Sequence, residues 1–363
     1  MEASALTHTD ELVAELQAQR KRTLALLGHL SDADVERVID PIMSPLVWDL
    51  GHIAAYEDLW LNHRFAGTRL LHPELAEFYD AFETPRAVRG DIEILGRADA
   101  LAYLADVRER VLTAAARLGT DPVLHELVLR HEMQHTETMR QCMALGGLLP
   151  VSEPRMRGVG GADDEFVTIA GGTFALGADD AGFAYDNERP RHAVEVPTFQ
   201  IARRPITNGS WRHFTEGGGY VRREWWSDEG WAWKEEYDIG RHAGWAARPA
   251  DEPVVHVSWF EADAFARARG ARLPTEAEWE KASTWGQLDA TGLVWEWTSS
   301  NFEGYPGFVA HPYREYSEVF FGDGYRVLRG GSWAAHPRVA TTTFRNWDLP
   351  QRRQLFSGVR LAR

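Results

Sequence analysis

The spacing of apolar residues divides the chain into two parts. Up to about residue 150, apolar residues recur at intervals of three and four, which is the period of a helix buried on one face. This pattern predicts four long helices, over residues 7–30, 44–65, 97–118 and 121–146. Four such helices joined by loops predict a helical bundle.

Beyond residue 150 the pattern changes to short β-type runs separated by Gly, Trp and turn-forming residues. Residues 150–165, PVSEPRMRGVGGADDE, are rich in Pro and Gly and indicate a domain boundary. Residues 165–177 predict a hairpin that turns at its Gly-Gly pair. Only residues 260–270 and 275–283 have clear helical patterns. We therefore expect a helical domain over 1–150 and a mixed α+β domain over 151–363.

Composition narrows the class of protein. The 363 residues are 44% hydrophobic and 26% charged, as in soluble globular proteins, and 15 Trp favour large cores or aromatic-lined pockets. A net charge of -15 argues against nucleic acid or an anionic membrane as partner. The single cysteine, Cys142, excludes an intramolecular disulfide and a cysteine-based zinc site. The N-terminus is acidic and amphipathic, unlike a signal peptide, so we expect a cytoplasmic protein, and a monomer.

The stretch RHEMQHTETMRQ, residues 130–141, contains the most specific chemical signal. His131 and His135 are four residues apart on a predicted helix, so both imidazoles lie on one face and could bind one metal ion. The same residues form the H-E-x-x-H pattern of zinc proteases, in which Glu132 would be the general base. A protease of this kind usually takes a third ligand from downstream, and no histidine follows here at the required spacing.

A third ligand is available upstream, at His52. Its neighbours are apolar, which places it on the buried side of the second predicted helix, and a bundle could bring it against His131 and His135. The alternative for His52 is a hydrogen-bonded core histidine. Three neutral imidazoles leave up to three open metal positions, which suits Fe(II) oxygen chemistry or a zinc-bound water. We interpret the remaining bundle histidines, His29, His63 and His125, as surface or capping residues.

With these motifs in place, the chain resembles the ergothioneine-biosynthesis sulfoxide synthases (the EgtB enzymes, hercynine oxygenases) of the mycobacterial type. The likeness covers nearly the whole chain. GHIAAYE (51–57) and HEMQHTET (131–138) match the metal motifs of that family, which implies Fe(2+) on His52, His131 and His135. The family's fold is a DinB-like four-helix bundle followed by a domain of the formylglycine-generating-enzyme type, which is related to C-type lectins.

The second half carries its own marks of that domain type. They are IAGGTFALGADD, NERPRHAVEV, PITNGSWRHF, PVVHVSWFEADAFARARGARLPTEAEWEKA, VWEWTSS, RVLRGGSWA and FSGVRLAR. Formylglycine-generating enzymes themselves bind copper through paired cysteines. This half of the chain has no cysteine, so that chemistry is excluded.

The resemblance implies an activity and its small-molecule substrates. Ferrous iron and O2 would join the thiol sulfur of γ-glutamylcysteine to the imidazole ring of hercynine (Nα-trimethylhistidine) and oxidise the sulfur to a sulfoxide. The segment FRNWDLPQRRQ carries the implied substrate residues: Asn346 and Trp347 for hercynine, and Asp348 and Arg352 for γ-glutamylcysteine. An aromatic ring suits a quaternary ammonium. The alternative for Asp348 and Arg352 is a mutual salt bridge.

Two further substrate contacts are expected from the bundle. Gln134 lies next to His135 and could hydrogen-bond a substrate imidazole or carboxylate. Arg86, in TPRAVRGD, is a candidate carboxylate clamp, with Arg89 less favoured; the alternative for Arg86 is a solvated surface charge.

A tyrosine of the second domain is implied as the proton donor that sulfoxidation requires. Tyr313 is the preferred candidate and Tyr305 the second; for each, the alternative is a packed loop aromatic. The chain departs from the family pattern near residues 235–245 and 283–293, where loops are short. This leaves open how loops close over the site and whether the domain binds calcium.

The sequence is also compatible with three other functions. A related synthase could use another donor, of the cysteine, ovothiol or selenoneine type. The ovothiol enzymes usually carry a methyltransferase domain, which this chain does not show. An H-E-x-x-H zinc hydrolase and a binding module with a structural metal are the remaining alternatives.

Overall fold

The computed structural model describes residues 8–151, 156, 158–244 and 248–363. The chain divides into two compact units, Met1–Glu153 and Pro154–Arg363. Among the described helices, none combines the length and apolarity needed to cross a lipid bilayer.

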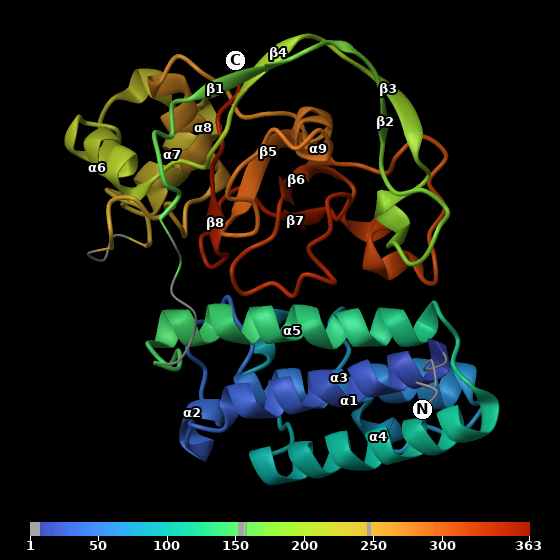
Figure 1. Ribbon diagram of the computed structural model, residues 1–363. Helices are drawn as coiled ribbons and strands as arrows, with labels where there is room; N and C mark the ends of the chain where they lie inside the picture. Colours follow the sequence, from blue (N-terminus) through green and yellow to red (C-terminus); the bar gives the residue numbers. More distant parts are fainter. Residues whose placement is uncertain (1–7, 152–155, 157, 245–247) are drawn as a thin grey trace, which may run out of the picture. The chain divides into compact units, whose positions relative to one another are not determined.

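The first unit is a bundle in which four long helices lie side by side (Figure 1). This confirms the predicted helical architecture. The second long helix does not keep one geometry throughout, since its last eight residues are π-helical. The elements are α1 (His8–Leu27), α2 (Asp32–Glu36), α3 (Leu46–Glu57) with its π-helical continuation η1 (Asp58–Phe65), η2 (Pro73–Leu75), η3 (Arg86–Val88), α4 (Arg97–Leu118) and α5 (Leu124–Gly146).

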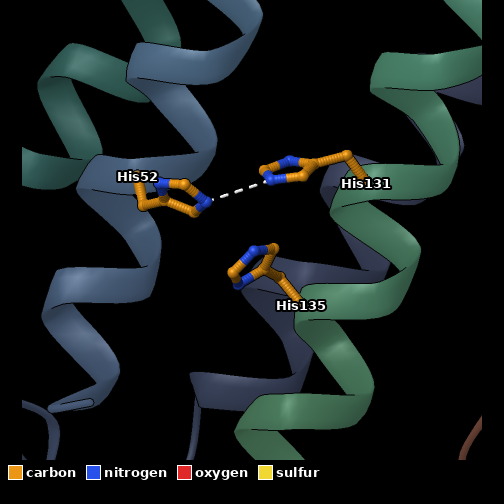
Figure 2. Close-up of side chains that lie close together, drawn as sticks. All are labelled: His52, His131 and His135. Carbon is orange, nitrogen blue, oxygen red and sulfur yellow. Dashed lines mark hydrogen bonds between the residues drawn. The ribbon is translucent and has the colours of Figure 1, made fainter. Parts of the chain in front are cut away.

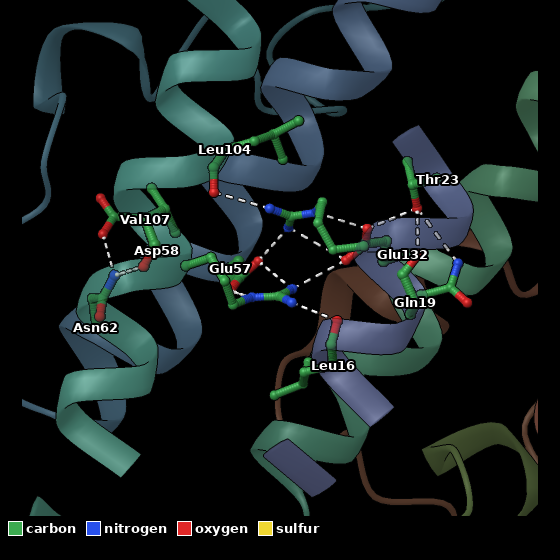
Figure 3. Close-up of polar contacts among 11 residues, drawn as sticks. Leu16, Gln19, Thr23, Glu57, Asp58, Asn62, Leu104, Val107 and Glu132 are labelled. Atoms are coloured by element: carbon green, nitrogen blue, oxygen red, sulfur yellow. Dashed lines mark hydrogen bonds and ion pairs between the residues drawn. The ribbon is translucent and has the colours of Figure 1, made fainter. Parts of the chain in front are cut away.

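A network of buried charges crosses the apolar interior of the bundle. Arg20 of α1 contacts Glu57 of α3 at 2.6 Å and Glu132 of α5 at 2.8 Å. Arg108 of α4 contacts Glu57 at 2.9 Å and Glu132 at 3.2 Å. Thr23 donates a further hydrogen bond to Glu132 at 2.7 Å. Figure 3 shows how the two carboxylates converge from different helices. Each of the four long helices therefore contributes one charge to a balanced set of two cations and two anions.

The surroundings favour the ionised form of Glu57. Burial by itself would raise the pKa of Glu57, but Arg108 and Arg20 outweigh it and hold that pKa below its usual range. The remaining donors of the two arginines reach backbone carbonyls of Leu104 and Leu16. Buried charges that are all paired in this way hold the helices together. Any other helix arrangement would separate the pairs and cost free energy.

The second unit begins with a long two-stranded ribbon. β1 (Phe166–Ile169) pairs with β4 (Phe199–Ala202), and β2 (Gly172–Leu176) pairs with β3 (His192–Val196), all antiparallel. The predicted hairpin over 165–177 is therefore wrong, since β1 and β2 do not pair with each other. They follow one another along the same arm of the ribbon (Figure 1).

The Gly-Gly pair marks a close approach between the arms rather than a turn. A Cβ on Gly171 would lie 2.7 Å from the backbone nitrogen of Thr198, and Gly172 has φ +122°. The N–H of Gly171 donates to Thr198 Oγ1 at 2.9 Å. Position 171 requires glycine because the backbone at Thr198 passes too close for a side chain, and position 172 favours glycine because of its positive φ.

A four-stranded sheet forms the centre of the second unit, in the order β7-β6-β5-β8. Its strands are β5 (Trp295–Phe302), β6 (Gly322–Arg329), β7 (Asn346–Asp348) and β8 (Ser357–Gly358). Buried ion pairs lie beside it, among them Arg360 with Glu296 at 2.7 Å. Short 3-10 turns connect the elements: η4 (Asp186–Glu188), η5 (Arg223–Trp225), η6 (Arg314–Tyr316) and η7 (Glu318–Phe320).

The described part of the second unit has more helices than the sequence pattern indicated. α8 (Trp259–Ala268) and α9 (Glu276–Thr284) match the two predicted ones. α6 (Asn208–Glu216) and α7 (Asp228–Glu236) were not predicted. Both are short and contain Gly and Trp, but both begin at an N-cap hydroxyl, Thr207 and Ser227, whose oxygen accepts from the N–H three residues on.

The charge network predicts a large loss of stability when one carboxylate is removed. Glu57→Gln should lower the free energy of unfolding of the bundle by about 3–5 kcal/mol, because two buried guanidinium groups lose one of the two carboxylates that they share. Chemical denaturation followed by far-UV circular dichroism measures this. Glu15→Gln is the matched control, because its partner Arg22 is 3.8 Å away and both side chains are solvent-exposed to a third or more. Its effect should stay below about 1 kcal/mol, and equal effects would contradict the prediction.

Candidate metal centre

Three histidine side chains converge inside the bundle. His52 comes from α3, and His131 and His135 come from successive turns of α5 (Figure 2). Nε2 of His52 lies 3.1 Å from Nε2 of His131. One nitrogen from each ring falls within 4.8 Å of the other two. The predicted three-histidine group is thus assembled by two helices, although its role as a metal site stays a prediction.

The outer nitrogens of two of these rings are engaged elsewhere. Nδ1 of His52 lies 2.6 Å from the backbone oxygen of Tyr79. A carbonyl only accepts, so His52 carries its proton on Nδ1 and leaves the Nε2 lone pair available. Nδ1 of His135 lies 3.1 Å from Oδ1 of Asp49. Partners of this type commonly fix the ring orientation and tautomer of metal-binding histidines.

Aromatic rings stack on two of the imidazoles, those of His52 and His131. Trp48 stacks on His52 with ring centroids 4.7 Å apart, and Tyr56 stacks on His131 at 3.7 Å. The guanidinium of Arg89 in turn lies over the ring of Trp48, 3.6 Å from its centroid. These planar contacts limit rotation of the imidazoles, so the group is pre-organised.

The environment favours the neutral form of two of the imidazoles, those of His52 and His131. Burial lowers the pKa of His52 well below its usual value, and the neighbouring His135 lowers it further. Burial likewise lowers the pKa of His131, with His135 and His52 adding to the effect. Neutral imidazole is the form that binds a metal ion, so no proton has to be displaced from these two rings near pH 7.

The donor set fits a first-row transition metal. Three imidazole nitrogens suit zinc, iron, copper or nickel, whereas Mg²⁺ and Ca²⁺ prefer oxygen ligands. The converging Nε2 atoms of His52 and His131 would repel one another unless a proton or a cation lay between them. A metal bound by three nitrogens retains open positions for substrates, which is a property of catalytic sites.

Glu132 takes no part in this group. Its carboxylate is only 1% exposed and is occupied by Arg20, Arg108 and Thr23 on another face of α5. A general base of a zinc hydrolase must reach a water on the metal. Glu132 does not meet that requirement, so the hydrolase interpretation of H-E-x-x-H is not supported.

The other bundle residues proposed for substrate binding occupy different environments. Gln134 is half-buried on α5, between the two histidine positions in sequence. Arg86 is exposed at the start of η3. Arg89 is buried and bonds to Ser44 Oγ at 2.8 Å besides contacting Trp48. The roles of Gln134 and Arg86 in binding remain predictions.

Sequence reasoning placed His125 incorrectly at the surface. Its side chain is 1% exposed, with Phe65 edge-on to the ring at 4.9 Å. The capping part of that interpretation is met, since Nδ1 accepts from the N–H of Asp121 at 3.1 Å, just before α5. His29 and His63 are exposed, as expected.

The predicted substrate residues of the second unit lie together on and after β7. Trp347 stacks on Phe302 at 4.2 Å, and Asn346 accepts from the N–H of Trp347 at 2.9 Å. Asp348 lies 3.6 Å from Nε of Arg352, which is the mutual ion pair left open by the sequence. Both charged side chains keep some exposure, 17% and 28%. To bind a zwitterionic substrate, Asp348 and Arg352 would have to separate, or contact the substrate while still paired with each other.

The two candidate proton donors differ in accessibility. Tyr313 is half-buried at the start of η6, with its ring 6.1 Å from that of Tyr316. Tyr305 is 6% exposed and packs in the core formed by the β1–β4 ribbon and α9. Its hydroxyl donates to Glu276 at 3.4 Å, and burial raises its pKa. Packing accounts for Tyr305 without a catalytic role, whereas Tyr313 remains the preferred candidate.

Several supporting residues were missed at the level of sequence. Asp49, Tyr56, Trp48 and Tyr79 all touch the histidine group. A signal for Asp49 was available, because it precedes His52 by three residues and so shares its helix face. Tyr79 gave no such signal, since it contributes only a backbone carbonyl from a loop.

Comparisons with known proteins agree with this division of the chain. Residues 15–145 match the DinB superfamily, and residues 153–291 and 281–363 match the sulfatase-modifying factor enzyme 1-like domain. The two segments of the second match meet where the sequence indicates a shortened loop.

Individual relatives match over different lengths. A hercynine oxygenase of Mycolicibacterium thermoresistibile is 41% identical over 437 residues, covering 100% of this chain and 96% of that protein. A hercynine oxygenase of Mycobacterium tuberculosis is 40% identical, covering 98% and 99%. The ergothioneine biosynthesis protein 1 of Schizosaccharomyces pombe is 28% identical over 50% of this chain and 28% of its own length.

The geometry predicts that His52 is needed for metal binding. His52→Ala should reduce the bound metal to background after loading with Fe(II) without O2, because two nitrogens from a single helix seldom retain a metal tightly. Metal content after gel filtration measures the loss. His29→Ala is the matched control, since His29 is exposed and lies outside the group; it should keep its full metal content. If His52→Ala retains as much iron as the parent chain, His52 is not a metal ligand.

Proposed function

The chain belongs to the hercynine oxygenase family, and on that premise we propose that it is an iron(II)-dependent sulfoxide synthase. It joins the thiol sulfur of γ-glutamylcysteine to the imidazole carbon of hercynine, using O2, in ergothioneine biosynthesis. The observation that carries the proposal is the convergent three-histidine group, present in a chain that matches hercynine oxygenases along its whole length.

In this proposal His52, His131 and His135 hold the iron. Bound there, Fe(2+) supplies O2 activation and open positions for substrate atoms. The protein's own part is to keep three imidazoles in place, which it does through the stacking rings and the outer hydrogen bonds. Because these supports exist without the metal, little reorganisation is needed when it binds.

The substrate residues are assigned by chemistry. Trp347 offers an aromatic face to the quaternary ammonium of hercynine, and Asn346 and Gln134 offer amide groups to its polar atoms. Asp348 would bind the α-ammonium of γ-glutamylcysteine and Arg352 its carboxylate, with Arg86 as a further carboxylate contact. Tyr313 would donate the proton at its hydroxyl. Tyr313 is more exposed to solvent than Tyr305.

We also propose that the enzyme acts as a monomer in the cytoplasm.

The single cysteine, Cys142, is buried in α5, and burial raises the pKa of its thiol to about 12. A thiol of this kind is unreactive. It would therefore not compete with the thiol substrate for O2 or iron.

Turnover tests the proposed reaction. The iron-loaded chain, given hercynine, γ-glutamylcysteine and O2, should produce γ-glutamyl-hercynylcysteine sulfoxide, identified by mass spectrometry. Cysteine and a selenium donor are offered in parallel reactions. If the enzyme turns over either of these donors faster than γ-glutamylcysteine, that compound and not γ-glutamylcysteine is the donor. The absence of sulfoxide with every donor would refute the proposed synthase activity.

The donor assignment makes a separate prediction for Asp348. Asp348→Asn should raise the KM for γ-glutamylcysteine about tenfold or more, because one charge-assisted contact to the ammonium is lost, while the KM for hercynine changes little. Steady-state kinetics with each substrate varied in turn measures both constants. Asp228→Asn is the control, since it removes a carboxylate that is 97% exposed in the same unit. An equal rise in both KM values would show that Asp348 supports the fold rather than the thiol donor.

A further inference from the structure

The three histidines differ in what holds them from outside. His52 is bound by a backbone carbonyl and a tryptophan ring, and His131 is stacked on a tyrosine. His135 is contacted by a carboxylate, with its Nδ1 3.1 Å from Oδ1 of Asp49. The side chain of Asp49 is 2% exposed. A buried carboxylate is therefore directed at one imidazole of the group.

Asp49 connects the two helices that build the centre. It lies three residues before His52 on α3, so both side chains project from the same face of that helix. His135 belongs to α5. In this way α3 supplies one histidine directly and holds a second one through a hydrogen bond.

No described residue neutralises Asp49 by direct contact. Its second oxygen, Oδ2, is buried and has no hydrogen-bond partner among the described residues. Arg89 is the nearby cation; burial lowers the pKa of Arg89 to about 10, and the charge of Asp49 only partly opposes that shift. The donors of Arg89 nevertheless go to Ser44, Thr84 and Ala81. A buried carboxylate with an unsatisfied oxygen costs free energy, so its retention calls for a functional reason.

The favourable interaction of an acid with the helix dipole does not explain why Asp49 is buried. Asp49 lies in the first turn of α3, where an acid stabilises the helix dipole. Asp99 has the corresponding place in the first turn of α4 and is exposed. An exposed aspartate meets the needs of the dipole without the penalty of burial. The burial of Asp49 is explained instead by its contact with His135.

We propose that Asp49 is a positioning residue of the metal centre, which fixes the tautomer and orientation of His135 and places a compensating negative charge behind it. The inference rests on the metal site of the proposed function. By accepting a hydrogen bond from the Nδ1–H of His135, Asp49 leaves Nε2 of that ring as the metal ligand and increases its basicity. The negative charge of Asp49 offsets part of the charge of the bound cation, which the imidazole ligands do not.

Two substitutions separate the hydrogen bond from the charge. Asp49→Asn is isosteric and keeps an acceptor oxygen but loses the charge, whereas Asp49→Ala loses both. Asp99→Asn is the matched control for the first-turn charge. Fe(II) affinity is measured without O2 by competition with a chromophoric chelator. We expect Asp49→Asn to bind Fe(II) about 10–100-fold more weakly, Asp49→Ala to bind more weakly still, and Asp99→Asn to match the parent chain.

A second readout responds to charge and not to fold. Loss of the negative charge should favour Fe(II) over Fe(III), so the midpoint potential of Asp49→Asn should rise. A tenfold change in the ratio of the two affinities corresponds to about 59 mV for one electron. Circular dichroism establishes that each variant is folded. If Asp49→Ala fails to fold, Asp49→Asn alone decides.

The outcomes distinguish this inference from the function on which it rests. If the parent chain does not bind Fe(II), the proposed iron site itself is wrong. If the parent binds Fe(II), and Asp49→Asn binds it with the same affinity and the same midpoint potential, Asp49 is not a positioning residue. The proposed synthase activity would then stand without it.

Discussion

The buried network of Arg20, Glu57, Arg108 and Glu132 is the constraint on which the first unit depends. Each charge comes from a different long helix, and each guanidinium contacts both carboxylates. Removing any member leaves an uncompensated charge in the interior. A bundle stabilised by apolar contacts alone tolerates sliding of one helix along another. This network does not, because a shift would separate charges that have no water to replace their partners.

That constraint extends to the histidine group. Glu57 follows His52 by five residues on α3, and Glu132 directly follows His131 on α5. The ionic contacts that tie α3 to α5 through Arg20 and Arg108 therefore also determine how the Nε2 atoms of His52 and His131 face one another. Two neighbouring environments in one bundle have opposite effects on ionisation. The arginines of the network hold the pKa of Glu57 below its usual range and favour its charged form, whereas burial lowers the pKa of His52 and His131 and favours their neutral form.

Short-range patterns predicted part of the second unit, and long-range pairing decided the rest. The segment containing Gly171 and Gly172 has the composition of a hairpin turn, yet the partner of β2 is β3, some 20 residues on in the sequence. Strand pairing depends on which surface is buried against α9 and Tyr305, and a local reading of residues does not contain that information. The unpredicted α6 and α7 show the converse case. Their N-cap residues carried a usable signal that their Trp and Gly content obscured.

The sequence by itself determined the helical bundle, because apolar residues at helical spacing act within each helix. It also placed His131 and His135 on one face, since residues four apart meet on any helix. The apolar residues around His52 indicated it as the candidate third member of the histidine group. The tertiary structure alone decided that Glu132 turns into the charge network, that Asp49 contacts His135, and that the carbonyl of Tyr79 holds His52. Those contacts join residues 27 to 112 positions apart, so they arise only when separate helices and loops pack together.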